Sequence, residues 1–102
     1  LKMRKNSPEV YSCEEVIPHV SREEVDFLLR KVSESPKFRN RLCCHKDTAD
    51  RQQEMFICLS GETYLRPSLH VGKDESLHVL RGSGDYVFFD EKGNIIDIVS
   101  LG

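Results

Sequence analysis

Short apolar runs separated by turn residues limit the possible folds of this chain more than any other feature. From residue 54 onward no apolar run is longer than residues 55–59, and Gly, Pro, Asp and Asn recur between the runs. Short runs bounded by turn residues at intervals of about 8 to 12 positions are typical of an all-β sandwich or barrel. Residues 54–102 are therefore predicted to form a mainly β region.

The clearest turn of this region lies at residues 90–94, between the apolar segments 86–89 and 95–99. The turn contains Gly93, and glycine takes a positive φ without steric cost. A five-residue loop between two apolar segments is typical of a β-hairpin. We expect a hairpin here.

A helix is predicted to begin at Ser21, because Ser21 and Glu24 have the spacing of a capping box. Apolar residues then recur with the helical period, at Val25, Leu28, Leu29 and Val32. Residues 33–36 are expected to end the helix. The apolar stripe is interpreted as packing surface, because a small domain needs its apolar faces for the core.

The chain is divided into three parts by these patterns. Residues 1–20 contain two X-Pro steps and no sustained period, so they are expected to form an irregular arm. Residues 21–53 are expected to hold the helix and a polar connector with room for a short strand. Residues 54–102 are the β region. With 102 residues in all, one small domain is expected.

The charge distribution excludes several partner classes. The net charge is -2, and both signs are interspersed along the chain. This gives no electrostatic footprint for nucleic acid or an anionic membrane. No apolar run approaches the roughly 20 residues of a membrane-spanning helix. The basic residues near the N-terminus are not followed by the apolar stretch of a secretory signal, so a cytoplasmic protein is expected.

The four cysteines, at positions 13, 43, 44 and 58, form neither a C-x-x-C pair nor a regular disulfide pattern. Two interpretations were compared. Cys43, Cys44 and His45 could form a soft-metal site, but neighbouring thiols rarely direct both sulfurs at one ion. The spacing favours small, semi-buried residues in a reduced protein.

Residues 61–82 carry the candidate chemistry. In a strand, alternate side chains share a face, so Tyr64, Arg66, Ser68 and His70 are predicted to point the same way. A short loop then returns the chain to a strand near Glu75, with Leu77 on the same face as Glu75. A tight antiparallel return brings Glu75 close to His70. An imidazole and a carboxylate can bind a divalent metal or act as an acid/base pair.

Two further residues, Arg66 and Tyr64, belong to the candidate site, and a third, His78, does not. Arg66 shares the face of His70, and a guanidinium inside a barrel needs an anion, either a ligand phosphate or carboxylate or a structural partner such as Glu75. Tyr64 is expected either to line the same cavity or to pack. His78 has the opposite parity to Glu75 and is predicted not to be a ligand.

Gly61, Ser68, His70, Glu75 and Gly82 resemble the first motif of the cupin superfamily, in which a Gly precedes a His-x-His pair, a Glu and a second Gly. Ser68 stands where that motif has its first histidine. More narrowly, the run YLRPSLHVGKDESLHVLRG, with FFDEKGNIIDIVSLG after it and the capped helix before it, resembles the WbuC family of cupin-fold metalloproteins. The resemblance extends from about Ser21 to Gly102.

The resemblance implies a cupin-like, RmlC-like jelly-roll β-barrel with an N-terminal helix. The barrel is expected to be partial, because the second cupin motif would lie after Gly102. It also implies a divalent metal (Zn, Fe, Mn or Ni) bound by His70 and Glu75, and a role near bacterial surface-polysaccharide (O-antigen type) synthesis.

Three functions remain open at this stage. The first is a metal-dependent or metal-assisted protein that binds a small anionic sugar or sugar nucleotide, with Arg66, Tyr64 and Ser68 in the ligand site. The second is a metal-free sugar-nucleotide isomerase or epimerase, and the third is a non-catalytic binding module. A homodimer is expected, because residues 54–102 supply fewer strands than a closed barrel needs and unpaired edges recruit partners.

Overall fold

The computed structural model describes residues 1–63, 65–69, 72 and 74–102. The chain divides into two compact units, Leu1–Tyr64 and Leu65–Gly102, each described here by itself. The described residues are mainly β, with one α-helix, as the sequence predicted. Their strands form a four-stranded and a two-stranded sheet and close no barrel. None of the described helices is long and apolar enough to span a bilayer.

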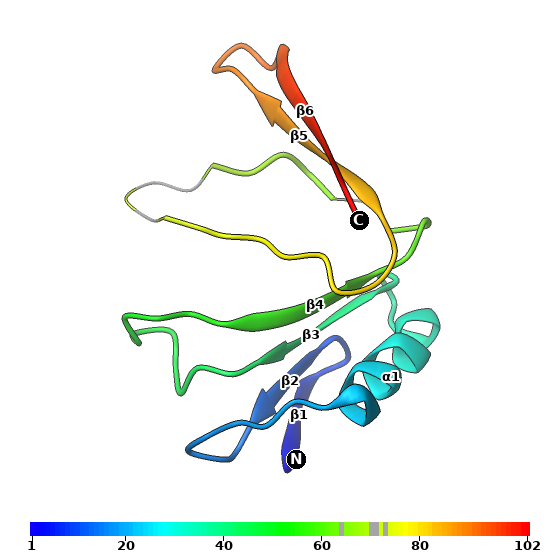
Figure 1. The fold of residues 1–102 in the computed structure, drawn as a ribbon, viewed down its shortest axis with the longest axis vertical. Coiled ribbons are helices and arrows are strands. Elements are labelled where there is room, and N and C mark those ends of the chain that lie inside the picture. The colour runs from blue at the N-terminus through cyan, green and yellow to red at the C-terminus, as the bar shows by residue number, and fades with distance from the viewer. Residues whose placement is uncertain (64, 70–71, 73) are drawn as a thin grey trace. The chain divides into compact units, whose positions relative to one another are not determined.

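The first unit is built on the four-stranded sheet, in the order β1-β2-β3-β4. These strands are β1 (Met3–Ser7), β2 (Val10–Cys13), β3 (Arg39–Cys43) and β4 (Met55–Leu59). The outer pairs are antiparallel, whereas β2 and β3 are parallel. Parallel neighbours need a crossover connection, and the helix α1 (Arg22–Lys31) provides it. Figure 1 shows α1 beside the sheet, and α1 contacts β3 and β4.

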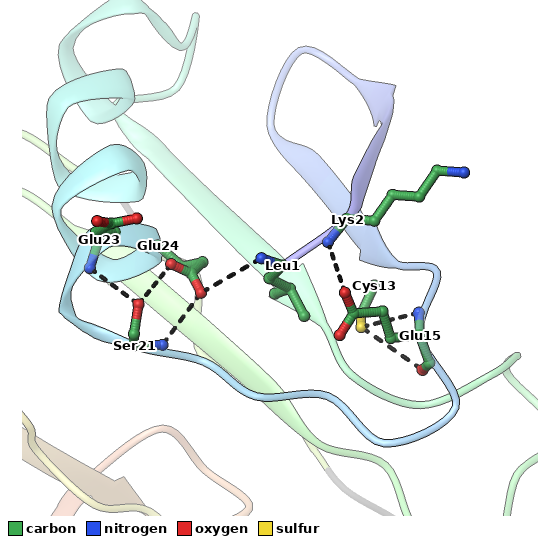
Figure 2. Close-up of polar contacts among 7 residues, drawn as sticks. All are labelled: Leu1, Lys2, Cys13, Glu15, Ser21, Glu23 and Glu24. Atoms are coloured by element: carbon green, nitrogen blue, oxygen red, sulfur yellow. Dashed lines mark hydrogen bonds and ion pairs between the residues drawn. The ribbon is translucent and has the colours of Figure 1, made fainter.

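The helix begins at the predicted capping box (Figure 2). The Ser21 hydroxyl accepts a hydrogen bond from the Glu23 N–H at 3.3 Å and donates to Glu24 Oε2 at 2.7 Å. The Ser21 N–H donates to Glu24 Oε1 at 3.2 Å. These contacts satisfy backbone groups that the first helical turn leaves unpaired. The helix then tightens into a 3₁₀ turn, η1 (Val32–Glu34).

The core of the first unit lies between α1 and the sheet. Its buried hydrophobic residues are Tyr11, Leu28, Val32, Leu42 and Cys58. Leu29, predicted on the buried stripe, is instead 40% exposed. The buried face is rotated toward Phe27, whose ring packs edge-on against Tyr11 with 5.4 Å between centroids. The helical period of the apolar residues was therefore predicted correctly. The predicted buried face was wrong at its edge, where it included Leu29.

The prediction of an irregular arm at residues 1–20 is wrong for residues 3–13, where β1 and β2 form an antiparallel hairpin, whereas residues 14–20 belong to no helix or strand. β1 is an edge strand of mostly polar residues, so it carries little apolar signal. Pro8 lies in the turn between Ser7 and Val10, where a missing N–H costs nothing. The expected connector does contain a short strand, β3.

The second unit contains the hairpin of β5 (Gly84–Phe89) and β6 (Ile95–Leu101), which confirms the predicted turn. The Asp90 N–H donates to the Asn94 carbonyl at 2.8 Å, and the Gly93 N–H donates to the Asp90 carbonyl at 3.1 Å. Gly93 has a φ of 85°, a conformation in which a Cβ would be strained. Other hydrogen bonds, which the carboxylate of Asp90 accepts, hold its pKa below the usual value; the largest cause is the Asn94 N–H, which donates to Oδ1 at 2.9 Å.

The strands predicted on either side of residue 72 are not present in the described residues. Residues 65–69 and 74–80 belong to no strand. The leucines of these segments are half or more exposed, at positions 65, 69, 77 and 80. Alternation predicts which side chains share a face, but a strand also needs a neighbour for its N–H and C=O groups. Pro67 removes one of those donors.

Candidate functional site

One cavity in the second unit combines a predicted site residue with the β5–β6 hairpin. We call it the hairpin cavity, and its volume is about 360 Å³. It is lined by Glu75, Leu77, Tyr86, Phe88, Val99 and Leu101. The last four alternate along β5 and β6, and Tyr86 is paired with Val99 in the antiparallel register. One face of the hairpin therefore forms a wall of the cavity.

Two aromatic rings give this wall its shape. The rings of Tyr86 and Phe88 lie 5.0 Å apart, centroid to centroid, at an angle of 46°. Both side chains keep part of their surface accessible, and 43% of Phe88 is exposed. Exposed aromatic surface in a concave site is typical of small-molecule binding.

Glu75 is the one acidic residue in the lining. It shares the cavity with Leu77, and residues 74–80 belong to no strand. Glu75 is an exposed residue. The cavity thus presents an anionic hydrogen-bond acceptor beside an apolar and aromatic wall.

The other predicted site residues have different positions. Arg66 and Ser68 are exposed and are not part of the lining of the hairpin cavity. His78, predicted not to be a ligand, is also exposed and absent from the lining. Tyr64 and His70 lie outside the described residues.

Tyr86 and Phe88 were not among the predicted site residues. The signal that could have identified them is present in the sequence, because both lie two residues apart on one face of the segment that precedes the predicted turn. The alternation of residues 86–89 therefore places both rings on one apolar face.

The fit of a divalent metal depends on the ligands that the site offers. Among the described residues, no group of three or more His, Cys, Asp and Glu side chains is arranged to hold a metal ion. The described lining of the hairpin cavity contributes one carboxylate, and metal sites in proteins generally need three or four protein ligands. The described residues alone therefore do not make a metal site.

Comparison with known proteins gave one family. A family model described as "Domain of unknown function (DUF6016)" matches residues 20–101. The matched range contains α1, β3 to β6 and all six residues of the hairpin cavity, and it leaves β1 and β2 outside. No curated protein and no solved structure matches the chain.

Proposed function

This chain belongs to the DUF6016 family of domains of unknown function, and we propose that it binds a small sugar-type ligand in the hairpin cavity. The observation that carries the proposal is the pairing of Glu75 with the rings of Tyr86 and Phe88 in one concave site.

The chemistry of a sugar suits this pairing. A sugar ring has an apolar C–H face, which packs on aromatic surface, and a rim of hydroxyl groups, which donate hydrogen bonds. The carboxylate of Glu75 can accept two such bonds, and bonds to an ionised acceptor are the stronger ones. A cavity of about 360 Å³ is at the small end of ligand sites, which begin near about 300 Å³.

A charged ligand, such as a sugar nucleotide, needs a cation as well. Arg66 is the residue that the sequence predicts for this role, and its exposed position leaves its guanidinium accessible to a phosphate. Conversion of such a ligand, as in an isomerase or epimerase, would need a general base, for which the sequence offers His70. Binding without conversion needs no general base.

Ligand binding can be tested with the full chain and two probes, UDP-glucose and glucose, by isothermal titration calorimetry. We expect saturable binding of at least one probe and a loss of about tenfold or more in affinity for Glu75→Gln, because the amide replaces an ionised acceptor. Glu91→Gln is the matched control, since Glu91 is exposed in the β5–β6 turn and is outside the lining. Equal affinity in all three proteins, or no saturable binding, would contradict the proposal.

A divalent metal is the second candidate ligand, with Glu75 as one of its ligands and His70, outside the described residues, as another. The resemblance to the WbuC family gives Glu75 the role of a metal-binding carboxylate. The test is the melting temperature of the purified chain with Zn²⁺, Mn²⁺, Ni²⁺ or Fe²⁺, compared with Glu75→Gln. A rise that is lost in the variant supports a metal, and no rise in either protein opposes it.

We also propose that the chain forms a homodimer. No described residue of the second unit is buried, and its large apolar side chains include Phe89, Ile96 and Ile98, each at least 41% exposed. A two-stranded hairpin is at best marginally stable without cover. Sedimentation velocity over a range of concentrations measures the mass, and a monomer at all concentrations would refute the dimer.

A further inference from the structure

Two cysteines that are distant in the sequence meet on neighbouring strands of the first unit. Cys13 ends β2, and Cys44 directly follows β3. The two strands are parallel, with Tyr11 opposite Leu42. Two residues further along each strand, the same register brings Cys13 opposite Cys44. Because side chains repeat every second residue, both thiols lie on the side of Tyr11 and Leu42, which is the core side.

Burial and electrostatics agree with this placement. Cys13 and Cys44 are both half-buried, and both pack against the core cluster. The pKa of Cys44 is raised to about 11, first by burial and then by Cys13, with smaller effects of Glu54 and Cys43. Both side chains therefore lie against the core on neighbouring strands, as the register places them.

The distance between neighbouring strands suits a covalent bond. Adjacent strands are separated by about 4.8 Å, and disulfides join residues whose Cα atoms are about 4.4 to 6.8 Å apart. The other two cysteines are placed differently. Cys43 precedes Cys44 and points to the opposite side of the sheet, where it is paired with Met55, and Cys58 is paired with Asn40 on β3.

We propose that Cys13 and Cys44 form a reversible disulfide that links β2 to β3 when a small disulfide oxidant of the glutathione class is present. Such a bond would join the C-terminal ends of β2 and β3 and close a loop that contains α1.

The exchange is balanced in two steps. The Cys13 thiolate attacks one sulfur of the oxidant, forms a mixed disulfide and releases one small thiolate. Cys44 then gives up its proton, and its sulfur attacks the Cys13 sulfur and releases the second small thiolate. The two protein thiols lose two electrons and two protons, and one oxidant molecule becomes two thiols.

The order of the steps follows from the environments of the two sulfurs. The raised pKa of Cys44 keeps it protonated near neutral pH, so Cys13 is the attacking residue. Figure 2 shows Cys13 Sγ beside Glu15, whose N–H donates to the sulfur at 3.3 Å. This contact holds the sulfur at the end of β2, where Cys13 is partly exposed.

The proposal is tested by incubating the folded full chain with oxidised glutathione, alkylating the remaining thiols and mapping the tryptic peptides by mass spectrometry. Cys43 and Cys44 lie on one tryptic peptide, so fragmentation between them assigns the bond in the wild type. We expect a Cys13–Cys44 link, a loss of two hydrogens, and alkylation at Cys43 and Cys58. The melting temperature should rise by about 5 °C or more on oxidation, because the bond closes a loop.

Three variants make the assignment independent of fragmentation. Cys43→Ser is the matched control and should still form the bond, whereas Cys13→Ser and Cys44→Ser should not. A link that persists in Cys44→Ser, or a wild type that ends with free thiols or only glutathione adducts, would overturn the proposal. The wild-type map decides the question even if a variant does not fold.

Discussion

Asn40 connects the sheet of the first unit to its helix, and its replacement by Asp gives a sharp test of the fold. Asn40 is 3% exposed on β3, and its Nδ2 donates to the Leu28 carbonyl oxygen at 2.7 Å. Among the described residues, its Oδ1 has no hydrogen-bond partner. Asn40→Asp keeps the shape of the side chain but exchanges the donor for a second oxygen.

The cost can be worked out from this geometry. The substitution removes one buried hydrogen bond and places a carboxylate oxygen against a carbonyl oxygen, where the original contact was 2.7 Å. An unsatisfied buried polar group costs about 1 to 3 kcal/mol, and an uncompensated buried charge about 3 to 5 kcal/mol. We expect a loss of about 3 kcal/mol or more in the free energy of unfolding at pH 7. At about 4 to 8 °C per kcal/mol, the melting temperature falls by at least about 12 °C.

The pH dependence distinguishes this cause from simple loss of packing. Burial raises the pKa of the new carboxyl group above its unfolded value of about 3.9. The folded state therefore binds the proton more tightly than the unfolded state. The destabilisation is small below about pH 4, where the protonated group can donate to Leu28, and grows as the pH rises through the folded-state pKa.

Urea unfolding followed by circular dichroism at pH 4 and pH 7 measures both effects. Asn6→Asp is the control, because Asn6 is exposed on β1, and its cost should stay within about 0.5 kcal/mol. A loss below about 1 kcal/mol for Asn40→Asp at pH 7, or an equal loss at both pH values, would refute the reasoning.

Three further outcomes are expected. Leu42→Ala should cost about 2 to 5 kcal/mol in urea unfolding, because Leu42 is 0% exposed, whereas Ile57→Ala, at 57% exposure, should cost under about 1 kcal/mol. Ser21→Ala should cost about 1 kcal/mol. Hydrogen bonds from the Ser21 hydroxyl, and to a smaller extent from the Ser21 N–H, lower the pKa of Glu24. The stabilisation that these bonds give is therefore present above the unfolded-state pKa of Glu24 and is lost as the pH falls through the folded-state pKa. Between pH 7 and pH 3, the free energy of unfolding should therefore fall less in Ser21→Ala than in the wild type. Gly93→Ala should cost about 1 to 2 kcal/mol, seen as faster hydrogen exchange in β5 and β6, since the φ of 85° disfavours a side chain.

The features that the sequence predicted correctly depend on partners close in the chain. The capping box needs only Ser21 and Glu24, and the β5–β6 turn needs only residues 90–94. In both cases the donors and acceptors are fixed by local spacing. The helix and the last hairpin could therefore be predicted without knowing the rest of the fold.

The errors involve partners that are distant in the chain. β2 pairs with β3 across the whole helical crossover, so nothing near residues 10–13 indicates a strand partner. Residues 65–69 and 74–80 have the alternation of strands but form no ladder in the described structure. The periodicity of a segment indicates which of its side chains share a face. Whether the segment forms a strand depends on a partner strand elsewhere in the chain.

The candidate site follows the same division. Glu75 and Leu77, which alternation within one segment predicts on a shared face, both line the cavity. The aromatic wall of Tyr86 and Phe88 was missed, because it lies on a different segment. Alternation along residues 86–89 puts the two rings on one face, but the cavity beside that face depends on the distant residues Glu75 and Leu77.

The two faces of the β5–β6 hairpin separate ligand binding from dimer formation. Tyr86 and Val99 line the cavity, whereas Val87 and Ile98 are paired on the opposite face. Ile98 is 53% exposed, so Ile98→Lys places a charge on the second face without touching the cavity. If that face holds the second copy, the variant should sediment as a monomer and bind UDP-glucose with unchanged affinity. A dimer that persists, or an affinity that falls with the dimer, would contradict the assignment of one face to each role.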